Sequence, residues 1–261
     1  MVKKLLLALC LCIQLHALEL VHEGELVSPF KQLLELCGLP SQATPAQAAE
    51  FTQEQWRQVG KERWELDDRF NELKSEGLAL LREIGCLDPI YAQKMEYEHA
   101  LVLGGLQSRV QRRLDFLFEE WKRGVRFHTL VFLTGQRAIE PTLENVPDGI
   151  ESETQMMQYL YRQHPLSQLD IPLVIIDAPR PYLGRRPNTA DTVHAWLKAH
   201  PVQGSCVAIS DQPNVGYQEA VLKGILPPSF SVEVIGTGDE GKLPISLYLD
   251  NLARWLCQLN L

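Results

Sequence analysis

The sequence has little positive charge. Its 261 residues include 25 Lys and Arg against 33 Asp and Glu, which gives a formal net charge of −8. A general nucleic-acid-binding protein needs a basic face, so this balance argues against a nucleic-acid partner. Hydrophobic residues make up 45% and charged residues 22%, as in ordinary globular proteins. The length suits one large domain, or a domain with an appended segment.

Several motifs of known chemistry are missing. No G-x-S-x-G motif is found, so a serine hydrolase has no support. Gly104 and Gly105 are not followed by the third glycine of a dinucleotide fingerprint, and no phosphate-loop lysine follows them. The six cysteines do not have the spacing of a zinc site. We therefore expect no metal site and leave the catalytic residues unassigned.

Long apolar runs are scarce, and the clearest one opens the chain. Lys3 and Lys4 precede an apolar run over residues 5–13, and Ala17 could end a cleavage region. This is the layout of a secretory signal peptide, whereas a spanning helix takes about 20 apolar residues. We expect residues 1–17 to direct export to the periplasm or cell envelope, and no transmembrane segment in the mature chain. The alternative is a buried N-terminal helix.

Export would allow a disulfide between Cys37 and Cys86, which both lie near predicted helix ends. Cys206 lies in an apolar stretch and is expected to be a buried thiol.

Residues 18–97 have a helical pattern. Ser28-Pro29 and Thr44-Pro45 are start signals, and Gly38 ends the first helix. Apolar residues then recur at spacings of three, four or seven, which predicts one helix with an apolar stripe: Trp56, Val59, Leu66, Phe70, Leu73, Leu80 and Ile84. Packing of this stripe on the protein's own second domain is favoured over a coiled coil or partner surface.

After Glu98 the pattern changes to strand, turn and helix. Strands are predicted over residues 100–103, 129–133, 173–176, 205–209 and 231–235. Helices are predicted over residues 109–123, 151–163, 189–199, 217–223 and 246–259. This alternation predicts an α/β fold. We expect a Rossmann-like, mostly parallel sheet of about five strands with helices on both faces, in a domain over residues 98–261 that follows the helical segment 18–97.

Ligands of open α/β sheets bind beyond the carboxyl ends of the strands. The candidate ligand-binding residues at those ends are Gly104, Gly105, Arg113, Thr134, Gly135, Arg137, Glu153, Asp177, Asn188, Thr189, Ser210 and Asp211. A glycine turn that opens a helix leaves backbone N–H groups for an anion, and arginine forks suit phosphate or carboxylate. Arg137 could form a cationic pocket with Arg180, Arg185 and Arg186. The expected partner is a small anionic molecule.

Some candidates have two interpretations. Glu153 follows Ser152 at a helix start, where its negative charge would interact favourably with the helix dipole, but it could also reach a ligand. Asp177 directly follows an apolar strand and could hold a hydroxyl or a cation, or form an Asx turn. Asn188 and Thr189 precede a helix and could both cap it and contact a ligand.

Short motifs occur in a fixed order along residues 98–236. They are VLGG at 102–105, Arg113-Leu114, a closing Gly124, LTG at 133–135, Ser152-Glu153, Asn188-Thr189 and Ser210. In this order and spacing the chain resembles the SanA/YdcF/ElyC-like family, a bacterial envelope-associated domain of unknown function. The family's His and Arg after the fourth strand are missing, because this chain has SDQPNVGYQEA there.

The resemblance implies a Rossmann-like sheet, a role in the cell envelope and a small anionic or nucleotide-like ligand. It implies no particular reaction. A second hypothesis is a non-catalytic envelope protein that contacts envelope components through its helical N-terminal segment. The missing His and Arg favour that hypothesis, since the ligand site would then be degenerate.

Overall fold

A computed structural model describes residues 18–182 and 185–259 of the chain. The predicted signal peptide, residues 1–17, lies outside the described residues. Among the helices that are described, none is both long enough and apolar enough to cross a membrane.

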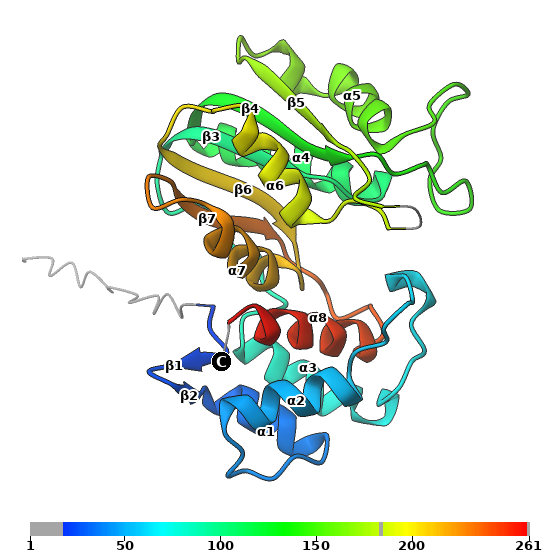
Figure 1. Cartoon of the computed structure of the whole chain (residues 1–261), viewed down its shortest axis with the longest axis vertical. Coiled ribbons are helices and arrows are strands. Elements are labelled where there is room, and N and C mark those ends of the chain that lie inside the picture. Colours follow the sequence, from blue (N-terminus) through cyan, green and yellow to red (C-terminus); the bar gives the residue numbers. More distant parts are fainter. Residues whose placement is uncertain (1–17, 183–184, 260–261) are drawn as a thin grey trace, which may run out of the picture.

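The core of the protein is a parallel sheet in the order β5-β4-β3-β6-β7 (Figure 1). Its strands are β3 (Glu96–Leu103), β4 (Arg126–Gly135), β5 (Leu173–Ala178), β6 (Ser205–Asp211) and β7 (Ser231–Thr237). Every neighbouring pair is parallel. Each predicted strand lies inside an observed one, so the α/β prediction is confirmed.

Helices cover both faces of the sheet, as predicted. They are α4 (Gln107–Arg123), α5 (Glu153–Gln163), α6 (Thr189–Lys198) and α7 (Val215–Ile225). Successive residues of a strand point to opposite faces. Accordingly, Ala100 and Val102 of β3 pack in the cluster with α4 and α5, whereas Leu101 and Leu103 pack in the cluster with α6 and α7.

The N-terminal segment is helical but does not contain the predicted long helix. Its elements are β1 (Val21–His22), β2 (Glu25–Leu26), α1 (Ser28–Leu36), α2 (Pro45–Gln55), the 3-10 helices η1 (Arg63–Glu65) and η2 (Asn71–Leu73), and α3 (Lys74–Glu83). The prediction of one helix with an apolar stripe from Trp56 to Ile84 is wrong, because α2 ends at Gln55. Gly60 then has a φ of +86°, outside the helical region, and Val59 is 82% exposed. Residues 57–73 are called the connecting segment below.

The last helix, α8 (Ile245–Gln258), joins the two parts of the chain. Tyr248, Leu252 and Leu256 pack in one cluster with Phe30 and Trp56 of the N-terminal segment. In Figure 1, α8 lies between α7 on one side and α2 and α3 on the other. The helix therefore belongs to the α/β domain by sequence and to the N-terminal helices by packing.

The four cysteines within the described residues are free thiols. Cys37 and Cys86 are free thiols, so the disulfide considered from the sequence is not formed. Cys206 is buried in β6, as expected.

Candidate functional site

A pocket of about 630 Å³ lies at the carboxyl edge of the sheet. Its volume is in the range of small-molecule sites, about 300–1,000 Å³. Its floor comes from the ends of β3 and β4 and from the starts of α4 and α6. Its other walls come from α7, α8 and the connecting segment. The site is thus built by both parts of the chain.

The glycine turn after β3 fits protein side chains closely. A Cβ atom on Gly104 would lie 2.7 Å from Glu153 Oε2, and one on Gly135 would lie 2.7 Å from Cβ of Pro187. Real Cβ atoms do not approach other atoms so closely. The two glycines are therefore required by the packing of Glu153 and Pro187, which itself shapes the pocket floor.

Glu153 is the one acidic residue among the described residues that line the pocket. It is only 7% exposed and accepts hydrogen bonds from Gly135 N at 2.9 Å and Arg137 Nε at 3.3 Å. Burial raises its pKa, and the nearby Arg137 offsets part of that effect. Ser152 caps α5 together with Gln155, so the predicted helix start is confirmed.

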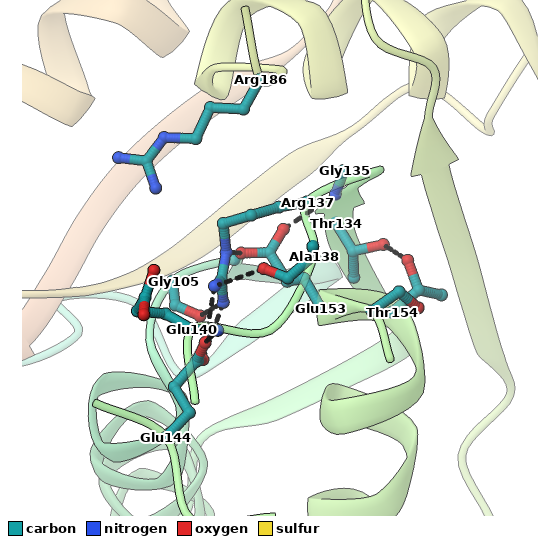
Figure 2. Close-up of polar contacts among 12 residues, drawn as sticks. Gly105, Thr134, Gly135, Arg137, Ala138, Glu140, Glu144, Glu153, Thr154 and Arg186 are labelled. Carbon is teal, nitrogen blue, oxygen red and sulfur yellow. Dashed lines mark hydrogen bonds and ion pairs between the residues drawn. The ribbon is translucent and has the colours of Figure 1, made fainter. Parts of the chain in front are cut away.

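Arg137 is held within the protein on every side (Figure 2). Nη1 donates to Glu144 Oε2 at 2.6 Å and to Ala138 O at 3.1 Å. Nη2 donates to Glu144 Oε1 at 2.8 Å and to Gly105 O at 2.9 Å. Burial alone would lower the pKa of Arg137, but its two carboxylate partners raise it. Arg137 therefore organises the floor of the pocket.

Arg113 has the same structural character. It is 2% exposed, and it donates from Nη2 and Nε to Asp211 Oδ1 at 2.5 and 3.1 Å. Its Nη1 donates to Leu103 O at 2.7 Å and Gly104 O at 2.6 Å. Burial would raise the pKa of Asp211, yet Arg113 and Arg109 lower it overall. This buried ion pair ties the start of α4 to the end of β6.

Other predicted site residues lie beside the pocket and not in its lining. Thr134 Oγ1 lies 2.5 Å from Thr154 Oγ1, which donates to Asp177 Oδ1 at 2.7 Å. Asp177 is exposed and bonded to the start of α5. Ser210 is buried and bonds to Gln218. Among the described side chains, no group of three His, Cys, Asp or Glu could hold a metal ion.

The start of α6 contributes to the pocket floor. Asn188 and Thr189 both line the pocket, and Asn188 forms a capping box with Asp191. Of the arginines expected to cluster, Arg186 also lines the pocket, together with Arg137. Arg185 pairs with Asp191 at 2.8 Å, and the exposed Arg180 donates to Gln136 O at 2.7 Å.

The connecting segment brings residues that the sequence did not place at the site: Arg63, Trp64 and Leu66. Arg63 donates to Asn214 Oδ1. No carboxylate of the described residues lies within ion-pair distance of Arg63. The Arg63 side chain is partly buried, with part of its surface exposed to solvent. Burial, followed by repulsion from Arg109 and Arg254, lowers the pKa of Arg63 to about 9, and attraction to Asp250 offsets part of this effect.

The arginines of the lining differ in how they are balanced. They are Arg63, Arg109, Arg113, Arg137, Arg186 and Arg254. Four of them have close carboxylate partners: Arg113 pairs with Asp211, Arg137 with Glu144, Arg186 with Glu62 and Arg254 with Asp250. Arg109 lies 3.8 Å from Asp211, a carboxylate already engaged by Arg113. The surplus positive charge is therefore concentrated at Arg63 and Arg109.

Comparison with known protein families, curated proteins and solved structures finds no match to this chain. The geometry of the pocket is therefore the basis on which a function can be assigned.

Proposed function

We propose that the pocket binds a small anionic, phosphate-bearing molecule whose anion lies between Arg63 and Arg109. The observation that carries this proposal is that no described carboxylate lies within ion-pair distance of Arg63, while Arg109 and Arg254 repel its charge and Asp250 offsets part of that repulsion. A partly buried charge without a close partner is costly, so an anion at this place would be stabilised. Arginine forks bind phosphate and carboxylate groups in a bidentate way.

Two helix starts add to the attraction for an anion. Gly105 and Leu106 directly precede α4, Thr189 begins α6, and all three line the pocket. Helix N-termini carry partial positive charge, which favours a nearby anion. Some of the N–H groups at these starts are already bonded within the protein, since Gln107 N donates to Glu144 and Asp191 N to Asn188. These starts support binding of a compact anion such as phosphate.

The class of ligand and the location of the protein are parts of the same proposal. The resemblance to the SanA/YdcF/ElyC-like family supports a small anionic ligand and a role at the cell envelope. The layout of residues 1–17 supports export. No reaction is assigned.

The alternative function, an interaction protein that works through its helical segment, is less well supported. That segment supplies Arg63, Trp64 and Leu66 to the pocket and shares its core with α8. Deletion of residues 18–94 should expose the apolar face of α8, so we expect aggregation or loss of cooperative thermal unfolding. A soluble, monomeric remnant that still binds phosphate would contradict the role of the N-terminal segment in the pocket.

The proposal is tested by isothermal titration of the full chain with inorganic phosphate, sulfate and AMP. We expect at least one of these anions to bind, and Arg109→Gln to weaken that binding about tenfold or more, since a hydrogen bond to a charged group contributes about 1.5–3 kcal/mol. Arg69→Gln is the matched control, because Arg69 is exposed and lies in the connecting segment outside the pocket. If none of the three anions binds to the wild-type protein, the proposal fails.

A further inference from the structure

Part of the pocket lining is apolar. Leu66 of the connecting segment, Leu106 before α4 and Leu247 of α8 line the pocket from three separate parts of the chain. Leu243 and Pro244, which directly precede α8, also line it. A ligand in this pocket therefore meets arginines and leucines together.

These three leucines lie outside the three apolar clusters of the described residues. Leu247 is only 7% exposed, yet it is absent from the cluster that its neighbours Ile245 and Tyr248 form with the N-terminal helices. Leu66 and Leu106 are partly buried. An apolar group in the pocket would remove the remaining surface of Leu66 and Leu106 from water, and Leu247 would add a contact.

Some polar side chains of the lining are already engaged within the protein. Asn214 Oδ1 accepts from Asn251 Nδ2 at 3.0 Å, and Asn214 Nδ2 donates to Asp211 O at 3.1 Å. Gln218 bonds to Ser210 through its amide oxygen. A nucleobase needs donors and acceptors for its edges, and a buried polar group left unpaired costs about 1–3 kcal/mol. Leucines also outnumber the aromatic side chains of the lining, Trp64 and Tyr217, so the lining favours an aliphatic group over a base.

We infer that the ligand is a phosphate monoester with an aliphatic chain. The inference rests on the proposed anion site: the phosphate lies between Arg63 and Arg109, and the chain lies against Leu66, Leu106 and Leu247. A single-chain lipid phosphate and a small soluble metabolite share this chemistry. Arginine pairing supplies the charge recognition, and burial of CH₂ groups supplies affinity in proportion to chain length.

Titration with an alkyl phosphate series tests the inference. Inorganic, methyl, butyl, hexyl and dodecyl phosphate are compared on the full chain, with AMP as the competing class. Each CH₂ that becomes buried should raise affinity by up to about fourfold. The affinity for butyl phosphate should therefore be at least about tenfold higher than the affinity for methyl phosphate. A gain that stops at hexyl indicates a small metabolite, and one that continues to dodecyl indicates a lipid.

The failure of this inference can be told apart from failure of the proposed function. If inorganic phosphate binds but affinity does not rise with chain length, or if AMP binds more tightly than hexyl phosphate, the aliphatic ligand is refuted and the anion site stands. If neither inorganic phosphate nor any ester binds, both are refuted.

A substitution in the apolar part of the lining gives an independent test. Leu66→Ser should reduce hexyl phosphate affinity several-fold toward that of methyl phosphate, and by a larger factor than it reduces inorganic phosphate affinity, because the apolar contact is lost. Val59→Ser is the matched control, since Val59 lies in the same segment at 82% exposure and does not line the pocket. Equal effects of the two substitutions, or no effect of Leu66→Ser, would overturn the inference. Thermal denaturation of both variants checks that they remain folded.

Discussion

Replacing Arg63 with glutamine should stabilise the protein in the absence of anions while it weakens anion binding. Arg63 is surrounded closely enough for burial to be the main cause of its lowered pKa, and Arg109 and Arg254 lower the pKa further. At neutral pH the guanidinium remains charged, so the folded state carries the unfavourable energy of a partly desolvated cation beside two like charges. Glutamine removes that charge and keeps a polar side chain.

The magnitude follows from the pKa of Arg63 and its contacts. The difference between an ordinary arginine pKa of about 12.5 and the value of about 9 for Arg63 corresponds to about 5 kcal/mol as an upper limit. Water at the open part of the side chain reduces this figure, and loss of the hydrogen bond to Asn214 subtracts about 1 kcal/mol. We therefore expect Arg63→Gln to raise the free energy of unfolding by about 1–2 kcal/mol.

Thermal denaturation with and without phosphate measures both effects. In an anion-poor buffer, Tm of Arg63→Gln should lie about 2–8 °C above wild type, since 1 kcal/mol shifts Tm by about 2–4 °C for a chain of this size. Saturating phosphate should raise Tm of the wild type more than that of the variant, because a ligand stabilises only the state that binds it. In Arg69→Gln, both values should stay close to wild type.

The result that refutes this reasoning is a variant less stable than wild type in the anion-poor buffer, with an unchanged response to phosphate. Arg63 would then be a structural residue that contributes through its bond to Asn214 and its packing. The energy of its charge would have to be balanced within the protein, and the anion site would lose its main support.

Two further predictions concern the floor of the pocket. Gly104→Ala should lower the free energy of unfolding by about 1–3 kcal/mol in urea denaturation, because its Cβ would lie 2.7 Å from Glu153 Oε2. Gly224→Ala is the control, because a Cβ on Gly224 would meet open space; it should leave stability unchanged or raise it by up to about 1 kcal/mol. Equal effects of the two substitutions would refute the packing of Gly104 against Glu153. Asp211→Asn should cost about 3–5 kcal/mol at pH 7, because it leaves the buried Arg113 unpaired. The pKa of Asp211 is lowered in the folded state, so its contribution is present above about pH 3.9 and is lost as pH falls through the folded pKa; the variant should lack this acid-dependent loss in urea denaturation at stepwise lower pH.

The sheet could be predicted from sequence because its strands are buried on both faces. Such strands are short apolar runs, which residues 129–133 and 205–209 show clearly. The start of β3 was predicted late, at residue 100, because Glu96 and Glu98 interrupt the apolar pattern at the less buried end of the strand. Strand ends that reach solvent do not carry the signal that identifies the strand.

The site could be predicted only in part. Five of the residues predicted for the site, Gly104, Gly105, Arg113, Arg137 and Glu153, line one pocket at the carboxyl edge. The carboxyl-edge rule contains no information about which protein groups these side chains bond to. Asp211 occupies donors of Arg113 from 98 residues away, and Glu144 occupies donors of Arg137 from a loop seven residues further on.

The sequence pattern predicts a helix through the connecting segment that the structure does not contain, and the reason is physical. Spacings of three, four and seven can arise by chance in a loop, and here they continued across Gly60, whose positive φ ends helical geometry. Gly60 was the local signal that could have divided the segment. With the break recognised, Arg63 and Trp64 would have been loop residues free to reach another part of the chain, where they now line the pocket.

The distribution of charge separates the residues that build the site from those that can serve a ligand. Arg113 and Arg137 lie at the carboxyl edge, but their donors are engaged by protein acceptors, so they fix the floor of the pocket. Arg63 comes from a segment with little regular structure and adds a charge that no described carboxylate pairs with at ion-pair distance and that Asp250 offsets only in part. A fold selected for stability alone would remove such a charge. Its place between the two parts of the chain is best explained by an anionic ligand that both parts bind.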